Sequence, residues 1–145
     1  MKRRVLFICT GNYYRSRFAE AYFNHQAERL GLGWEAFSRG LAIHMLGPEF
    51  LISPQTEERL AAREIELRHT APYRRQLSEE DLLGAEVIVA LKDDEHRPMM
   101  RTQFPGWVER VVYWDVGDQP DVRPEDGLGA IEREVMGLMG SLSSD

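Results

Sequence analysis

The fold of this chain is decided near its start by the stretch Val5-Leu6-Phe7-Ile8-Cys9-Thr10-Gly11-Asn12-Tyr13-Tyr14-Arg15-Ser16. Its four apolar residues are typical of a buried β-strand, and they end abruptly at a cysteine. A small polar loop follows, and helical periodicity begins at Ser16. The backbone N–H groups of such a loop and the start of a helix converge on one point, where they favour an anion. The stretch therefore predicts a phosphate-binding loop that carries its own nucleophile, Cys9.

The rest of the chain alternates strands with helices. The expected strands are 5–8, 34–38, 86–91 and 110–114, and the expected helices are 16–30, 53–63, a short one from 78, 93–102 and one from 124. Ser53 and Ser78 are the expected N-caps, and Pro98 is expected to be tolerated only near the start of its helix. The alternation predicts one α/β domain over residues 1–145, with a four-stranded parallel sheet flanked by helices.

Side chains with useful chemistry follow three of these strands. In a parallel α/β sheet, ligands bind beyond the carboxyl ends of the strands, where the chain switches direction. We therefore expect one edge of the sheet to gather the side chains that follow the first, third and fourth strands, namely Cys9, Lys92, Asp93, Asp115 and Asp118.

Composition excludes several classes of protein. The 145 residues carry a net charge of −6, which disfavours nucleic acid as a partner. The sequence has no apolar run of about 18 residues, so no membrane partner is expected, and the apolar run at 5–8 is too short for a signal sequence. The chain is therefore expected to be cytoplasmic. Its one cysteine excludes an internal disulfide, and no metal site or cofactor is expected.

The spacing of Cys9, Arg15 and Ser16 suits a thiolate that attacks phosphorus. A helix N-terminus, N–H donors and a guanidinium all stabilise a thiolate, and they also bind a tetrahedral dianion. Gly11 permits a tight turn, and Asn12 tolerates left-handed backbone. Ser16 can donate a hydrogen bond to the sulfur. The predicted phosphate-binding residues are Thr10, Gly11, Asn12, Tyr13, Tyr14, Arg15 and Ser16.

This loop resembles the active-site loop of the low-molecular-weight protein tyrosine phosphatases, a family that shares a flavodoxin-like fold with thioredoxin-coupled arsenate reductases. The resemblance covers nearly the whole chain. It includes Ser38-Arg39-Gly40 after the second strand, the stretch 74–82, the stretch 91–97 with His96, and the late acidic loop 114–118.

The resemblance implies a metal-free hydrolysis of phosphomonoesters. Cys9 would form a phosphocysteine intermediate, while Arg15 and the loop amides would stabilise the equatorial oxygens. A late aspartate would protonate the leaving oxygen and then activate water. The expected substrate is a phosphorylated protein or a small aryl phosphate. The sequence does not determine the oligomeric state.

The choice of the acid is open between two aspartates. The family's acid normally precedes a proline, whereas this chain has Asp118-Gln119-Pro120. When Trp114 is aligned with the tryptophan of the reductase branch, Asp118 falls on the acid. Asp115 is the alternative, and Asp121 is interpreted as a solvated carboxylate.

Other departures leave alternative functions open. Tyr14 stands where many family members carry a second cysteine, so no disulfide can protect an oxidised Cys9. Lys92 occupies a relay position of the reductases, which excludes internal arsenate reduction but not reduction by an external thiol. A phosphate-binding module without turnover is the third possibility. Arg39 and the Arg74-Arg75 pair are interpreted as exposed, and His96 as structural.

Overall fold

The computed structural model describes residues 2–143. The strands and helices are β1 Arg3–Cys9, α1 Arg15–Leu30, β2 Trp34–Gly40, α2 Pro54–Ala62, α3 Glu79–Leu83, β3 Val87–Ala90, α4 Asp93–Gln103, β4 Val112–Tyr113 and α5 Pro124–Ser143, with the 3-10 turns η1 Ile43–Met45, η2 Leu67–His69 and η3 Pro105–Arg110. Every predicted strand and helix is present, although β4 is shorter than expected. Among the described residues, no helix is long and apolar enough to cross a membrane.

The four strands form one parallel sheet in the order β2-β1-β3-β4, as predicted. Cys9 at the end of β1 is in register with Gly40 of β2, and Ile8 is in register with Ala90 of β3. The chain moves outward from β1 to β2 and then crosses to β3 on the other side. The switch point of the sheet therefore lies between the ends of β1 and β3, which is where a ligand is expected.

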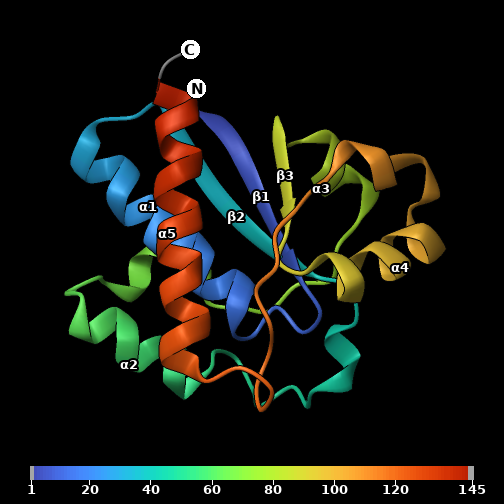
Figure 1. Ribbon diagram of the computed structural model, residues 1–145, viewed down its shortest axis with the longest axis horizontal. Coiled ribbons are helices and arrows are strands. Elements are labelled where there is room, and N and C mark those ends of the chain that lie inside the picture. Colours follow the sequence, from blue (N-terminus) through green and yellow to red (C-terminus); the bar gives the residue numbers. More distant parts are fainter. Residues whose placement is uncertain (1, 144–145) are drawn as a thin grey trace.

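Helices cover both faces of the sheet (Figure 1). Val5, Phe7 and Cys9 of β1 face the core under α1 and α5, whereas Leu6 and Ile8 face the core under α3 and α4. Because each face is buried, the β1 sequence is a continuous apolar run rather than an alternating one. Figure 1 shows α1, α2 and α5 to one side of the sheet and α3 and α4 to the other.

The starts of two helices follow the predicted capping chemistry. Ser53 Oγ accepts the N–H groups of Gln55 and Thr56 at the start of α2. At α3, Ser78 and Asp81 form a reciprocal capping box. These caps fix where each helix begins after its loop.

Pro98 corrects the expectation for α4. The helix runs from Asp93 to Gln103 with Pro98 well inside it, not near its start. A proline there removes the hydrogen bond to the carbonyl of Asp94. Asp94 and Pro98 are both exposed, so solvent can reach this side of the helix. The helix continues past the proline on its remaining hydrogen bonds.

Candidate active site

The phosphate loop begins where β1 ends and is closely packed against the end of β2. A Cβ on Gly40 would lie 2.8 Å from the carbonyl oxygen of Thr10 and 2.9 Å from the backbone nitrogen of Asn12. These are backbone atoms, which cannot move aside as a flexible side chain can. A glycine is therefore required at the end of β2 for the loop to turn beside it.

Hydrogen bonds under the loop direct a proton toward the sulfur of Cys9. Asn12 has a left-handed backbone, with φ of 52°, and its Oδ1 accepts the N–H of Arg75 at 2.8 Å. Its Nδ2 donates to Ser16 Oγ at 2.9 Å and to Ser38 Oγ at 3.0 Å. Ser16 Oγ lies 2.9 Å from Cys9 Sγ. Because Ser16 accepts from Asn12, its own proton is left to donate to a thiolate at Cys9.

The network continues into the core through two charged residues that the sequence analysis did not single out. Ser38 Oγ donates to Glu20 Oε1 at 2.7 Å, and Thr70 Oγ1 donates to the same oxygen at 2.8 Å. Arg17 donates through Nε to Thr70 at 2.8 Å and lies 3.9 Å from Glu20. Burial raises the pKa of Glu20 above its usual value, against these hydrogen bonds and the charge of Arg17. This buried polar network supports the phosphate loop from behind.

Arg15 is held end-on by Glu95, at the start of α4. Its Nη1 donates to Glu95 Oε1 at 3.0 Å, and its Nη2 donates to Oε2 at 2.6 Å. Nη1 also donates to the carbonyl of Val116 at 3.0 Å, while the Arg15 side chain is only 2% exposed. Burial alone would lower the pKa of Arg15, but its bonds to Glu95 raise it. The guanidinium is therefore charged and fixed in one orientation beside Cys9.

Glu95 itself is held by two further groups. Thr10 Oγ1 donates to its Oε2 at 2.5 Å, and His96 Nε2 lies 3.1 Å from the same oxygen. His96 Nδ1 accepts the N–H of Lys92 at 3.0 Å, so the ring proton is on Nε2. Burial lowers the pKa of His96, and the ring is neutral. Burial would raise the pKa of Glu95, but bonds from His96, Arg15 and Thr10 hold it well below its usual value.

Sequence reasoning missed Glu95 although a signal was present. Glu95 belongs to the acidic run that follows β3, the same strand that was expected to bring Lys92 and Asp93 to this edge. Glu95 lies about one helical turn after Lys92, so the two side chains leave the start of α4 on a similar side. The side chain of Glu95 contacts Thr10 and Arg15 of the phosphate loop. His96 is fully buried beside it, as its structural interpretation predicts.

The three candidate aspartates of the late loop have different surroundings. Asp118 Oδ2 lies 3.4 Å from Arg15 Nη2, and the residue lines the same cavity as Cys9. Asp115 instead pairs with Lys92 at 2.7 Å, and its side chain is 86% exposed. Asp121 is exposed. Of the three, Asp118 lies beside the phosphate loop.

A cavity of about 320 Å³ opens above Cys9. Its lining residues are Cys9, Thr10, Gly11, Tyr13, Tyr14, Arg15, Met45, Leu46, Asp118 and Gln119. The cavity thus brings together a thiol, a guanidinium, a carboxylate and apolar walls. Asn12 and Ser16, the two other predicted phosphate-binding residues, are buried behind the loop and act on it through hydrogen bonds.

Tyr14 packs beneath the late loop. It is 6% exposed, and its hydroxyl has no hydrogen-bond partner within residues 2–143. Burial, together with the negative charge of Asp118, raises the pKa of Tyr14 to about 12, so the hydroxyl stays neutral. Tyr13 is partly exposed instead, with its ring edge-on to Phe50 at 6.0 Å between centroids. The two adjacent tyrosines therefore have different surroundings.

Two arginines are not exposed in the way the sequence analysis expected. Arg39 has a side chain only 13% exposed and pairs with Asp81 at 3.1 Å. Arg74 is partly buried, and its guanidinium donates to backbone carbonyls of the phosphate loop and of the segment after β2. The carbonyls that Arg74 contacts lie in the phosphate loop and in the segment after β2, whose positions sequence periodicity does not predict. Arg75 is exposed as expected.

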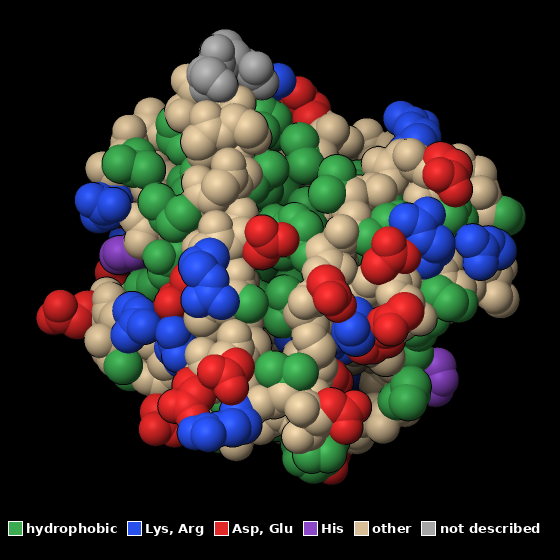
Figure 2. Space-filling model, viewed as in Figure 1, with side chains coloured by type: hydrophobic (Ala, Val, Ile, Leu, Met, Phe, Trp, Pro, Cys, Tyr) green, Lys and Arg blue, Asp and Glu red, His purple; other side chains and the backbone are tan. Residues whose placement is uncertain are grey.

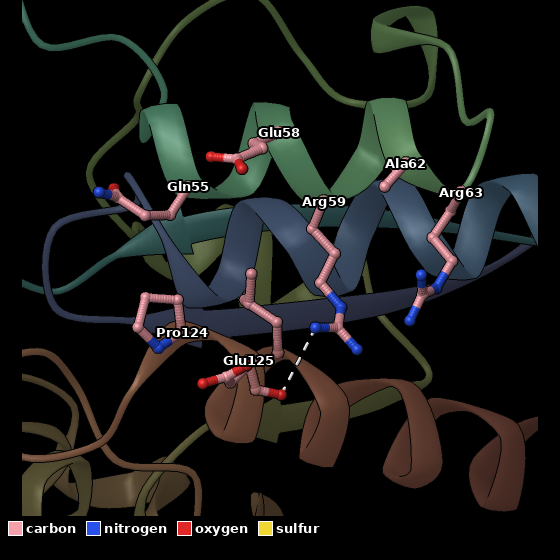
Figure 3. Close-up of a pocket in the computed structure, with 8 residues that line it drawn as sticks. Gln55, Glu58, Arg59, Ala62, Arg63, Pro124 and Glu125 are labelled. Atoms are coloured by element: carbon pink, nitrogen blue, oxygen red, sulfur yellow. Dashed lines mark hydrogen bonds between the residues drawn. The ribbon is translucent and has the colours of Figure 1, made fainter.

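A second cavity, of about 400 Å³, lies between α2 and α5 (Figure 3). Arg59 of α2 and Arg63, the residue that caps the end of α2, point into it, and a dashed line in Figure 3 joins Arg59 to the backbone of Glu125. Both arginines pair with Glu132, at 2.9 Å and 3.0 Å. The cavity contains neither Cys9 nor another nucleophile, so the chemistry belongs to the smaller cavity.

The geometry is that of a cysteine-based phosphatase, and comparison with known proteins agrees. Residues 4–143 match the model of the family described as low molecular weight phosphotyrosine protein phosphatase. The chain belongs to this family and is a phosphatase.

Individual relatives differ in the substrates that their names give. The protein-arginine-phosphatase of Bacillus subtilis is 32% identical over 107 residues, which are 74% of this chain and 67% of the relative. The low molecular weight protein-tyrosine-phosphatase of Streptomyces coelicolor is 37% identical over 103 residues, 70% of this chain and 60% of the relative. An arsenate reductase of Staphylococcus aureus is 42% identical over 48 residues, which are 33% of this chain and 34% of the relative.

A solved structure extends the likeness to the whole chain. The low molecular weight protein tyrosine phosphatase from T. tengcongensis has a TM-score of 0.77 and 29% identity, covering 99% of both chains. The predicted flavodoxin-like arrangement with a phosphatase loop after the first strand is thereby confirmed.

Proposed function

We propose that this phosphatase hydrolyses aryl phosphates of the phosphotyrosine type through a phosphocysteine intermediate. The observation that carries the proposal is the shared cavity, which is lined by Cys9, Arg15 and Asp118, with the Arg15 guanidinium 3.4 Å from the Asp118 carboxylate. A nucleophile, an anion-binding cation and an acid are the three groups that this chemistry requires.

In the first step, the thiolate of Cys9 attacks phosphorus and the bond to the leaving oxygen breaks. Asp118, protonated, gives its proton to that oxygen, so the alcohol departs neutral. Arg15 and the N–H groups of the loop bind the equatorial oxygens, where the negative charge lies. Ser16 donates to the sulfur when it becomes a thiolate again.

In the second step, water replaces the alcohol. Asp118, now a carboxylate, takes a proton from the water as its oxygen attacks phosphorus and the bond to sulfur breaks. Inorganic phosphate leaves, and Asp118 is again protonated. Each turnover consumes one water and one phosphomonoester, and it uses no metal or cofactor.

An aryl substrate is supported by the ring of Tyr13 at the mouth of the cavity. An aromatic side chain stacks on a phenyl group. The name of the Bacillus subtilis relative raises phosphoarginine as a second substrate, and the carboxylate of Asp118 at the same mouth would attract its guanidinium. The expected cytoplasmic location stays a prediction.

The experiment that tests this proposal is hydrolysis of p-nitrophenyl phosphate by the wild type and by Cys9→Ser, Asp118→Asn and Asp115→Asn. We expect no turnover in Cys9→Ser and a kcat reduced about 100-fold or more in Asp118→Asn. Asp115→Asn is the matched control, because it changes the neighbouring exposed carboxylate. An equal loss in both asparagine variants would contradict the assignment of Asp118.

Two further functions are distinguished by the same preparations. Arsenate-dependent oxidation of an external thiol, without ester hydrolysis, would indicate a reductase, which is the activity that the name of the Staphylococcus aureus relative gives. Binding of inorganic phosphate without either activity would indicate a binding module. Comparing a phosphotyrosine peptide with a phosphoarginine peptide decides between the two substrate classes.

A further inference from the structure

The segment after β2 is fastened by two arginines through its backbone. We call residues 43–51 the rim segment. Arg74 donates to the carbonyls of Ile43 at 2.8 Å and Gly47 at 2.7 Å, and also to those of Leu46 and Phe50. The same guanidinium donates to Gly11 in the phosphate loop at 3.3 Å. This one side chain therefore fixes the rim segment against the loop that holds Cys9.

A second arginine holds the end of the rim segment. Arg17 donates to the carbonyl of Leu51 at 2.5 Å and to that of Ala71. Just beyond, the N–H of Ser53 donates to the carbonyl of Tyr13 at 2.9 Å. Since Arg17 is 2% exposed, this end of the segment is tied to the interior of the protein. The rim segment is thus held in place although three of its apolar residues, Met45, Phe50 and Leu51, are exposed.

Those apolar side chains are left in solvent. Met45 is 69% exposed, Phe50 is 43% exposed and Leu51 is 47% exposed. Figure 1 shows the rim segment passing below the carboxyl ends of the strands, beside the loop that precedes α5. In the same orientation, Figure 2 shows hydrophobic side chains at this lower edge of the molecule.

Two of these exposed side chains, Met45 and Phe50, adjoin the cavity above Cys9 or its lining. Met45 and its neighbour Leu46 line the cavity itself. The ring of Phe50 lies edge-on to Tyr13, which is another lining residue. A substrate whose phosphate reaches Cys9 would therefore lie beside Met45 and the Tyr13–Phe50 ring pair, and the residue next to the phosphorylated one would be close to them.

We propose that Met45, Phe50 and Leu51 form a docking surface for an apolar residue adjacent to the phosphorylated residue of a protein substrate. The proposal rests on the phosphatase function proposed above. It adds a preference for substrates that carry an apolar residue beside the phosphorylated residue. Continuity with the cavity favours this occupant, because the phosphorylated residue and its neighbour are joined by covalent bonds. A backbone fixed in advance lowers the entropy lost on binding.

The test uses pairs of phosphotyrosine peptides. The two peptides of a pair differ only in one residue beside phosphotyrosine, which is leucine in one and serine in the other. One pair varies the residue before phosphotyrosine, and a second pair varies the residue after it. For the wild type, we expect the leucine peptide of at least one pair to have a kcat/KM about tenfold higher than its serine counterpart, which corresponds to about 1.4 kcal/mol. The variants are Leu51→Ser and the double variant Phe50→Ser/Leu51→Ser, in which this ratio should fall toward one. Leu51→Ser should retain wild-type hydrolysis of p-nitrophenyl phosphate, which has no flanking residue.

Leu67→Ser is the matched control, because Leu67 is 48% exposed but lies in η2. It should retain the leucine preference. An equal kcat/KM for both peptides in the wild type, or a preference that survives in the double variant, would overturn the proposal. A dimer in sedimentation that becomes monomeric in the double variant, with no peptide preference, would assign the surface to a second copy of the chain.

A failure of the proposed hydrolysis can be told apart from a failure of the docking proposal. If the wild type does not hydrolyse p-nitrophenyl phosphate, the same peptide pairs are compared by fluorescence polarisation, with binding to Cys9→Ser as the readout. A leucine preference that the double variant loses would then support the docking surface although the reaction is different. Equal binding of both peptides would reject it.

Discussion

Glu95 holds the guanidinium of Arg15 in one orientation at the wall of the cavity above Cys9. Its two carboxylate oxygens accept from both Nη atoms of Arg15, at 3.0 Å and 2.6 Å, so the guanidinium cannot rotate freely. A charge-assisted pair of this kind is stronger than a neutral hydrogen bond, and its geometry is more specific. Arg15 is therefore preorganised before any ligand binds.

Replacing Glu95 by glutamine should reduce kcat. The amide keeps the size of the side chain but loses its charge, and its NH2 group cannot accept from Arg15. We expect a loss of about 10- to 100-fold in kcat, in line with the strength of a charge-assisted pair. Steady-state kinetics of Glu95→Gln measure this, with Glu109→Gln, at an 87% exposed side chain, as the control. Wild-type kcat in Glu95→Gln would contradict the role of Glu95.

Cys9 should be oxidised without internal rescue. Tyr14 stands in the position of the second cysteine of many relatives, and the sequence contains no other cysteine. Strong peroxide should therefore carry Cys9 to the sulfinic or sulfonic acid, which thiols do not reduce. The measurement is activity recovered with dithiothreitol after peroxide, compared between the wild type and Tyr14→Cys. Full recovery in the wild type, from a state other than the sulfenic acid, would contradict the prediction.

At the scale of elements, the end of β2 and the phosphate loop form one packed unit. Gly40 is in register with Cys9, and its Cα hydrogen faces the backbone of Thr10 and Asn12. The buried network of Ser38 and Glu20 joins β2 to α1 beneath the same loop. The geometry of the loop thus depends on two elements besides its own.

Gly40→Ala should lower activity and stability together. The new methyl group would meet Thr10 O at 2.8 Å and Asn12 N at 2.9 Å, so the loop must shift. We expect a loss of about 1–3 kcal/mol in the free energy of unfolding and a lower kcat. Urea unfolding and hydrolysis assays measure the two effects. Gly33→Ala is the control, since a Cβ at Gly33 has no neighbour within 4 Å. Equal effects in both variants would reject the packing argument.

At the scale of the whole molecule, burial of neutral histidine makes stability depend on pH. His96 is fully buried, and burial lowers its pKa below the usual value. The pKa of His69, which is also buried, is lowered in the same way, with burial as the first cause. The unfolded chain therefore binds more protons than the folded one as pH falls below about 6.5.

Stability should consequently decrease as the pH falls below about 6.5. The slope is at most about 1.4 kcal/mol per pH unit for each such histidine, because one proton is taken up on unfolding. His96→Gln should flatten this dependence, and the loss of the hydrogen bonds of His96 should also lower stability at pH 7. The measurement is urea unfolding at pH 7 and pH 5.5, with exposed His44→Gln as the control. An unchanged slope in His96→Gln would contradict the assignment.

The sequence by itself determined the phosphate loop and the class of fold. Strand, loop and helix are contiguous from residue 5 onward, so their geometry follows from local hydrophobic pattern and backbone preference. The same holds for the caps at Ser53 and Ser78, which depend on residues two or three positions away. Membership of the phosphatase family followed from the same local motifs.

Only the tertiary structure decided which distant groups surround the loop. Glu95 lies 80 positions from Arg15, and Arg74 lies 63 positions from Gly11, yet both are in direct contact. No local pattern encodes such pairs, because sheet order and the packing of loops bring them together. The same long-range packing separates Asp118, in the cavity wall, from Asp115, which pairs with Lys92. Local interactions formed the loop that holds Cys9, and long-range packing selected its neighbours.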